Sequence, residues 1–271
     1  MIKSVEINYN GKDTNTKYFY LREDWSTGEK RKLLPEKIDF EPGLNIVIGA
    51  NGCGKSSLLN ILTDYTLARG MNNQWSFWED LTPFYPLCYG FDTNYKPQDM
   101  VKLVNDYTAP VHRMDNLGVK TKRHGGQISS FQDFGRFMTE NKMSKGQALM
   151  STLKASIMEA NAKMQNYTID SLFFDTTNVN DTWKTAVEKA KEAIYQFHDD
   201  TLEKQMVFIM DEPDEGLDID NLAALRDFLI EASKTVQVIV VLHNALLIKS
   251  LADKANVIEL SEGYLKKIGD F

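Results

Sequence analysis

Short apolar runs and helix-like stripes divide the chain into predicted strands and helices. Residues 4–10 alternate apolar and polar side chains, which predicts a strand with one buried face. Residues 44–48, 206–210 and 236–242 are apolar at almost every position, a pattern typical of strands that are covered on both faces. We therefore expect these three segments to form the centre of a sheet.

Helical spacing of apolar side chains follows two of these runs. Leu58, Leu59 and Leu62 share one face of a helix expected from residue 55 onward, and residues 222–229 carry a similar stripe between the last two runs. The last two runs thus form a strand, a helix and a second strand, and both strands are continuously apolar. This order predicts a parallel sheet covered by helices. Two further amphipathic helices are predicted, one beginning at Ser144 and one passing through Trp183.

The pattern is poor between residues 69 and 141, where aromatic residues, prolines and polar turns leave no long periodic segment. Nowhere does an apolar run approach the roughly 20 residues that a membrane span needs. The first residues also lack the apolar centre of a signal peptide. The two cysteines, Cys53 and Cys88, cannot form a disulfide framework, so we expect a cytoplasmic location.

The charge of the chain is unevenly distributed. The 271 residues carry a formal net charge of -7, which does not indicate nucleic-acid binding over the whole surface. Lys120, Lys122, Arg123 and His124 form a local basic cluster followed by two glycines. This cluster could contact phosphates, although a solvated loop is the commoner interpretation. Both interpretations stay open at this point.

A glycine-rich loop, GANGCGKS, occupies residues 49–56 between a predicted strand and a predicted helix. It matches the phosphate-binding pattern G-x-x-x-x-G-K-[ST], which requires those two flanking elements. Glycines let the backbone wrap closely around phosphate oxygens, and the N–H groups at the start of the helix attract the anion. We expect Lys55 to reach the β- and γ-phosphates and the Ser56 hydroxyl to bind Mg²⁺.

Two carboxylates follow the apolar run 206–210. Asp211 and Glu212 fall at the carboxyl end of this strand, where parallel sheets bind ligands. Asp211 could hold Mg²⁺, and Glu212 could orient and deprotonate an attacking water. His243 ends the next apolar run at the same edge of the sheet, so a contact with the γ-phosphate is favoured over a purely structural role.

Five segments in this order resemble the motif set of the ABC-type ATPases, a superfamily of transporter ATPase subunits and SMC/Rad-type repair ATPases. They are GANGCGKSS, MSKGQ, VFIMDEP, EGLD and VVLHN, and the tail 251–268 is similar to the strands that follow the histidine in that family. The resemblance implies an α/β P-loop NTPase fold. Its core would be a mixed or parallel sheet, with an N-terminal antiparallel β part and a helical lobe. It also implies a head-to-tail dimer around two ATP molecules.

The resemblance implies a role for each matching residue. Glu212 would be the general base, with Lys55 and His243 completing the catalytic set, and Asp211 and Ser56 would hold Mg²⁺. The residues implied to contact ATP are Gly49, Ala50, Asn51, Gly52, Cys53, Gly54, Lys55, Ser56 and Ser57 in the loop, and Ser144, Gly146, Gln147 and Asp218 across the dimer.

Three departures from the family pattern stand out. The signature has lysine where transporters usually have a glycine before Gly146, and the distance from Ser144 to Asp211 is unusually long. The Q-loop glutamine is either Gln98 or Gln127. The aromatic side chain that stacks on the base is equally open; the candidates are Tyr18, Tyr20 and Trp25.

These features predict a single ATPase domain, residues 1–271, with two lobes. Residues 1–68 and 205–271 would form the nucleotide-binding core, and residues 69–204 a helical lobe with an insert at about 166–204. The departures favour a stand-alone ATPase whose dimerisation acts on nucleic acid or an effector protein in repair or defence. Two alternatives remain: the ATPase subunit of a membrane transporter, and an ATP-controlled switch that holds an effector complex together.

Overall fold

A computed structural model describes residues 1–9, 32–66, 69–70, 101–109, 111–114, 168–169, 177, 181–195 and 198–270. Its main sheet has six strands in the order β4-β6-β7-β8-β3-β9, and every neighbouring pair is parallel. The strands are β3 (Leu44–Ile48), β4 (Arg69–Gly70), β6 (Val111–Met114), β7 (Val207–Asp211), β8 (Gln237–Val241) and β9 (Asn256–Glu259).

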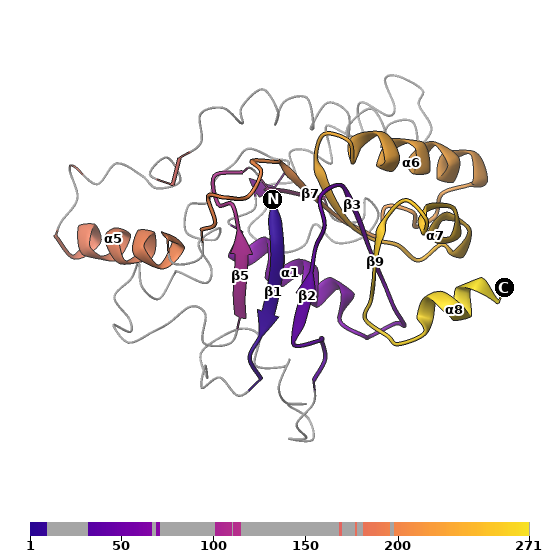
Figure 1. The fold of residues 1–271 in the computed structure, drawn as a ribbon, viewed down its shortest axis with the longest axis horizontal. Helices are drawn as coiled ribbons and strands as arrows, with labels where there is room; N and C mark the ends of the chain where they lie inside the picture. The colour runs from indigo at the N-terminus through magenta and orange to yellow at the C-terminus, as the bar shows by residue number, and fades with distance from the viewer. Residues whose placement is uncertain are drawn as a thin grey trace.

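A second, antiparallel sheet contains the N-terminal strand. It has the order β2-β1-β5, formed by β1 (Ile2–Ile7), β2 (Lys37–Asp39) and β5 (Val101–Asn105), which lie side by side in Figure 1. Gln237 of β8 joins the two sheets, because its buried side chain accepts a hydrogen bond from Ile2 N and donates one to Ile2 O, both at 2.8 Å.

Helices and the antiparallel sheet cover the two faces of the parallel sheet. Val238 and Val240 belong to one apolar core with α6 (Ile219–Ala232), α7 (Ala245–Leu251) and α8 (Tyr264–Gly269). Ile239 and Val241 point into a second core with α1 (Lys55–Tyr65) and the antiparallel sheet. Because successive residues of a strand face opposite sides, burial on both faces explains the continuous apolar runs.

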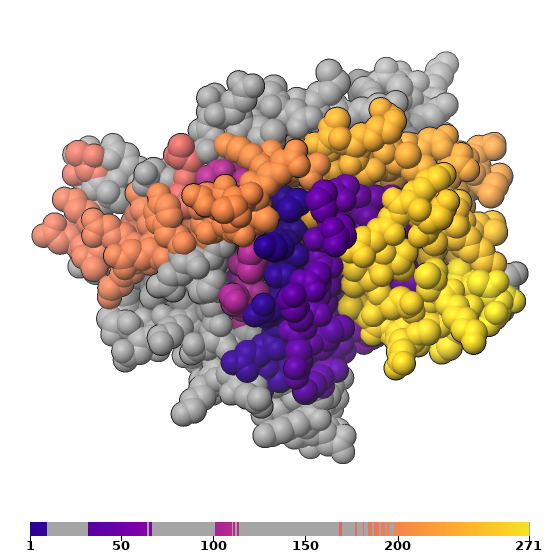
Figure 2. Space-filling model, viewed as in Figure 1, coloured from indigo at the N-terminus to yellow at the C-terminus, as the bar shows by residue number. Residues whose placement is uncertain are grey.

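The C-terminal segment completes the parallel sheet. Residues of β9 pair with β3 in parallel, and in Figure 2 the yellow C-terminal residues lie directly against the purple segment that contains β3. The helix α5 (Asp181–Tyr195) lies apart from this region, on the far side of the antiparallel sheet in Figure 1. Within the described ranges, no helix is both long and apolar enough to cross a membrane.

These observations confirm the predicted fold class: an α/β protein with a parallel core sheet and an N-terminal antiparallel part. All four predicted strands are present, and their ends differ by at most three residues from those expected, which were 4–10, 44–48, 206–210 and 236–242. The helix predicted through Trp183 begins at Asp181. The predicted helix from Ser144 lies outside the described residues, so the helical lobe stays a prediction.

The structure corrects the interpretation of residues 69–141. This range contains β4, β5 and β6, although no periodic signal stood out there. β4 and β6 have only two and four residues, too few for a pattern to stand out from the surroundings. β5 has five residues, as many as β3, but its buried positions alternate with more exposed ones, so it lacks a continuous apolar run. β5 pairs with β1 and β6 pairs with β7, so the sheets of the core include residues beyond position 68. The division into two lobes itself stays a prediction.

Candidate nucleotide site

The glycine-rich loop, residues 49–56, connects β3 to α1 as predicted. Gly54 has a φ of 101°, and a Cβ atom there would lie 2.8 Å from Leu34 Cδ2 and 3.0 Å from Leu33 Cγ. Gly52 also has a positive φ, at 80°. L side chains rarely adopt this conformation, so the loop needs glycine at both positions. The sequence of the loop therefore determines its shape.

The start of α1 is open to an anion. Its N-cap residue, Gly54, has no side chain to cap the helix, and its first turn contains no acidic residue. The N–H groups of a first turn have no partner within their own helix, and the helix dipole places partial positive charge there. The loop and the helix together can therefore hold a phosphate group by backbone contacts alone.

Lys55 is held at this position by the loop itself. Its side chain is buried, and Nζ donates hydrogen bonds to Gly49 O at 2.9 Å and Ala50 O at 3.1 Å. Ser261, from the turn after β9, supports the same loop, because Ala50 N donates to Ser261 Oγ at 3.1 Å. The ammonium group is thus placed beside the loop, where phosphate oxygens could replace the two carbonyl acceptors.

Glu212 and His243 form the opposite wall of the site. Asp211 ends β7 and pairs with Val241 near the end of β8, so the residues that follow these strands emerge at one edge of the sheet. There His243 Nε2 lies 2.8 Å from Glu212 Oε1, and both side chains are about one-third exposed (35% and 33%). Glu212 also has a φ of 52°, which is uncommon for a residue with a side chain. The predicted convergence of these two side chains is present.

Two residues that the sequence analysis did not select lie at the same edge. Asp214 Oδ2 accepts hydrogen bonds from the backbone N–H groups of His243 at 2.9 Å and Asn244 at 2.6 Å. Arg113 of β6 lies 3.9 Å from Asp211 Oδ2. It also donates to Asn60 and Thr63 of α1. Neither residue belongs to a local motif. Arg113 lies beside Asp211 because β6 pairs with β7, and Asp214 lies beside His243 because β7 pairs with β8.

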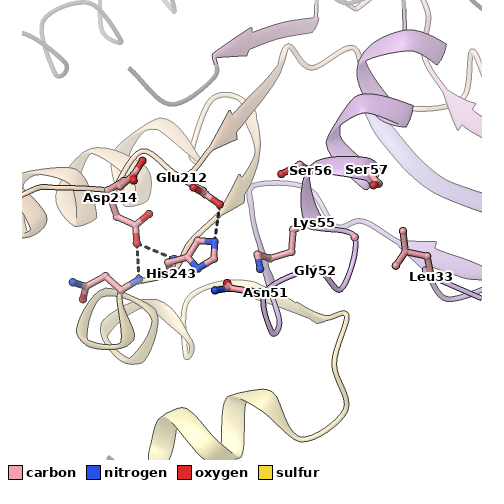
Figure 3. Close-up of a pocket in the computed structure, with 12 residues that line it drawn as sticks. Leu33, Asn51, Gly52, Lys55, Ser56, Ser57, Glu212, Asp214 and His243 are labelled. Carbon is pink, nitrogen blue, oxygen red and sulfur yellow. Dashed lines mark hydrogen bonds and ion pairs between the residues drawn. The ribbon is translucent and has the colours of Figure 1, made fainter. Parts of the chain in front are cut away.

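The two walls enclose a pocket of about 760 Å³, shown in Figure 3. It brings together most of the predicted site residues of the loop with Glu212 and His243. Its lining residues are Leu33, Asn51, Gly52, Gly54, Lys55, Ser56, Ser57, Glu212, Asp214, Glu215, His243 and Asn244. A volume of this size is in the range of ligand pockets.

The other predicted residues are not part of the pocket lining or lie outside the described residues. Gly49, Ala50 and the half-buried free thiol Cys53 complete the loop. Asp218 is the N-cap of α6, where Oδ1 accepts from Asn221 N at 2.9 Å. The residues that lie outside the described part are Ser144, Gly146, Gln147, Gln98, Gln127, Tyr18, Tyr20, Trp25, Cys88 and the basic cluster at 120–124.

The side chains near the pocket fit Mg²⁺ held jointly with a nucleotide. Among the described residues, no three or more His, Cys, Asp or Glu side chains gather as a metal site. Mg²⁺ usually takes only one or two protein ligands and completes its octahedron with phosphate oxygens and water. Ser56 is exposed and lines the pocket, whereas Asp211 ends β7 and is not part of the pocket lining; these two side chains could supply such a pair of ligands.

Comparisons with known proteins agree with the loop geometry. A family model described as an AAA domain matches residues 31–70, which contain β3, the glycine-rich loop and α1. No curated protein matches the chain. The fold and the site define a P-loop nucleotide-binding domain, and the family match supports, over residues 31–70, the resemblance to ABC-type ATPases.

Two solved structures are similar to the chain. One is a nucleotide-free ATP-binding cassette from an ABC transporter, with 14% identity, a TM-score of 0.35 and coverage of 100% of this chain and 96% of that chain. The other is the dimeric structure of a bacterial ABC transporter cassette, with 13% identity, a TM-score of 0.36 and coverage of 97% and 95%. Both TM-scores are too low for these likenesses to indicate a function, so the function is inferred from the site.

Proposed function

We propose that this chain is an ABC-type ATPase, which binds ATP with Mg²⁺ and hydrolyses it to ADP and phosphate. The observation that carries the proposal is one pocket with a phosphate-binding loop on one wall and a paired glutamate and histidine on the other. Phosphate binding alone would need only the first wall. The second wall supplies a base for hydrolysis.

The loop wall would bind the phosphates. Lys55 and the first N–H groups of α1 carry positive charge toward the pocket, and both favour a polyanion. Ser56 and Asp211 would hold Mg²⁺, which when bound neutralises charge on the phosphate oxygens. Arg113, at 3.9 Å from Asp211 Oδ2 and bonded to α1, would keep this carboxylate in place beside the loop.

The other wall would activate water. Glu212 is partly exposed to the pocket, and one of its oxygens is already oriented by His243 Nε2 at 2.8 Å. A carboxylate fixed in this way can accept a proton from a water aligned with the γ-phosphate. His243 then acts by orienting the base as well as by the γ-phosphate contact expected from the sequence.

The test is phosphate release measured with purified protein and Mg²⁺-ATP. We expect turnover in the native chain, and a loss of at least about 100-fold in Glu212→Gln with nucleotide binding retained, because only the base is removed. Lys102→Ala, an exposed lysine of β5 that pairs with Glu6, serves as the control and should retain full turnover. Unchanged turnover in Glu212→Gln would exclude the proposed base.

We further propose that ATP binding closes a homodimer, with Ser144, Gly146 and Gln147 of one copy at the ATP of the other and Asp218 between them. The order of the five motifs supports this proposal. The Glu212→Gln variant, incubated with ATP, should elute as a dimer in size-exclusion chromatography and return to a monomer with ADP. A monomer under both conditions would contradict the proposal.

The partner of this dimer is proposed to be an effector protein or nucleic acid in the cytoplasm. The long segment between Ser144 and Asp211, which includes the helix α5, supports a stand-alone ATPase over a transporter subunit. ATPase assays with added DNA, RNA or ribosomes would detect a nucleic-acid partner by stimulated turnover. Stimulation only by a co-purified membrane permease would favour the transporter alternative.

A further inference from the structure

The carboxylate of Asp214 is almost completely buried and, among the described residues, bonds only to main chain. Its exposed fraction is 4%, and its Oδ2 accepts both the His243 and the Asn244 N–H groups. Its Oδ1 is buried, with no hydrogen-bond partner in the part of the chain that the structure describes. Burying a carboxylate with one oxygen unsatisfied costs free energy, so this arrangement needs a reason beyond packing.

The two N–H groups held by Asp214 belong to the turn that carries the histidine of the site. His243 and Asn244 follow β8, and Asn244 then caps α7 by accepting from Leu246 N and Leu247 N. Hydrogen bonds from N–H groups to a charged carboxylate are stronger than those to neutral acceptors. Asp214 therefore fixes the main chain of this turn at the position from which the imidazole extends.

The turn that contains Asp214 also contains Glu212. Glu212 adopts its uncommon φ of 52° while its N–H donates to Val241 O at 3.2 Å, and Glu215 N donates back to Glu212 O at 3.2 Å. A residue keeps such a strained backbone conformation only where contacts with its surroundings hold it in place. The Glu212 turn and the His243 turn are thus joined twice, by the Asp214 carboxylate and by the Glu212–His243 side-chain bond, as Figure 3 shows.

We propose that Asp214 is a positioning residue for hydrolysis: by holding the His243–Asn244 main chain, it keeps the imidazole bonded to Glu212. This proposal rests on the proposed function, because it assigns Asp214 a part in orienting the base. Asp214 also lines the pocket, but in this proposal it acts through His243 and not as a ligand of ATP or Mg²⁺. Its loss should therefore lower turnover without weakening nucleotide binding.

The test compares four proteins: the native chain, Asp214→Asn, His243→Ala and the double variant. Asn keeps the size of the side chain and removes its charge. We expect Asp214→Asn to lower kcat about 10-fold or more, as misplaced catalytic groups do, with KM for ATP changed less than about 3-fold. In the His243→Ala background the same substitution should have almost no further effect, because the group it positions is already absent.

Asp227→Asn is the matched control, since Asp227 is exposed on α6 and pairs only with its neighbour Arg226 among the contacts described. It should retain the native kcat. If Asp214→Asn does not fold, as judged by its Tm, Asp214→Ser replaces it in the same comparison. With either substitution at Asp214, the comparison with and without His243→Ala tests the proposal.

Three results would overturn the proposal. They are an unchanged kcat in Asp214→Asn, an equal loss in the presence and absence of His243, and a rise in the Mg²⁺ concentration needed for half-maximal turnover, which would make Asp214 a metal ligand. A native chain without any ATP hydrolysis would instead contradict the proposed function itself. The two failures are thereby distinguishable.

Discussion

Glu212 Oε1 lies 2.8 Å from His243 Nε2, although 31 residues separate the two in the chain. They meet because β7 and β8 are parallel neighbours, with Asp211 opposite Val241, so that both strands end at one edge. A carboxylate and an imidazole at hydrogen-bond distance can position or exchange a proton. This pair faces Lys55 across the pocket.

If orienting Glu212 is the main contribution of His243 and the γ-phosphate contact a minor one, removing both side chains should cost about as much as removing Glu212 alone. We expect His243→Ala to lower kcat about 10-fold to 100-fold, and the variant with Glu212→Gln and His243→Ala to match Glu212→Gln. The measurement is single-turnover hydrolysis of ATP. Losses that multiply in the double variant would show that His243 works independently of Glu212.

Lys55→Ala should remove a buried positive charge from the phosphate wall. Because charge-assisted bonds to phosphate are strong, we expect the affinity for ATP to fall at least about 10-fold. Titration with a fluorescent ATP analogue measures this affinity. Lys102→Ala, on the antiparallel sheet, should bind the analogue as the native chain does. Native affinity in Lys55→Ala would contradict the role of the loop.

Gly54→Ala should strain the loop, because the added Cβ would meet Leu34 Cδ2 at 2.8 Å in a backbone with φ of 101°. We expect a loss of about 1–3 kcal/mol in the free energy of unfolding, together with weaker ATP binding. Urea denaturation measures the first quantity. Gly269→Ala is the matched control, since nothing lies within 4 Å of its added Cβ and its φ is not positive; equal stability losses in the two variants would refute the steric argument.

Gln237→Leu should remove the hydrogen bonds that connect the two sheets. The substitution leaves Ile2 N and Ile2 O buried without the Gln237 side chain, and each lost partner costs roughly 1–3 kcal/mol, so about 2–6 kcal/mol of unfolding free energy should disappear. Thermal and urea unfolding both report it. The control is Lys234→Leu, an exposed position in the connection between α6 and β8. A Gln237→Leu protein as stable as the control would contradict this link between the sheets.

The local sequence was sufficient to predict those parts of the structure that depend on neighbouring residues alone. The glycines at positions 52 and 54 permit the positive φ angles that the loop requires, and the loop-to-helix transition follows directly. The apolar runs of β3, β7 and β8 were recognisable because these central strands are buried on both faces. From the same reasoning, Asp211, Glu212 and His243 could be placed at one sheet edge before the structure was known.

Tertiary structure decided what depends on pairing between distant segments. The places of β5 and β6 beside β1 and β7 come from long-range hydrogen bonds that no local pattern encodes. Arg113 reaches Asp211 only because β6 lies next to β7. Asp214 belongs to no motif of the sequence, and only the fold brings it to the His243 main chain. A sequence thus determines which groups it offers and which local shapes they can take, whereas the burial and pairing of distant segments determine which of those groups meet.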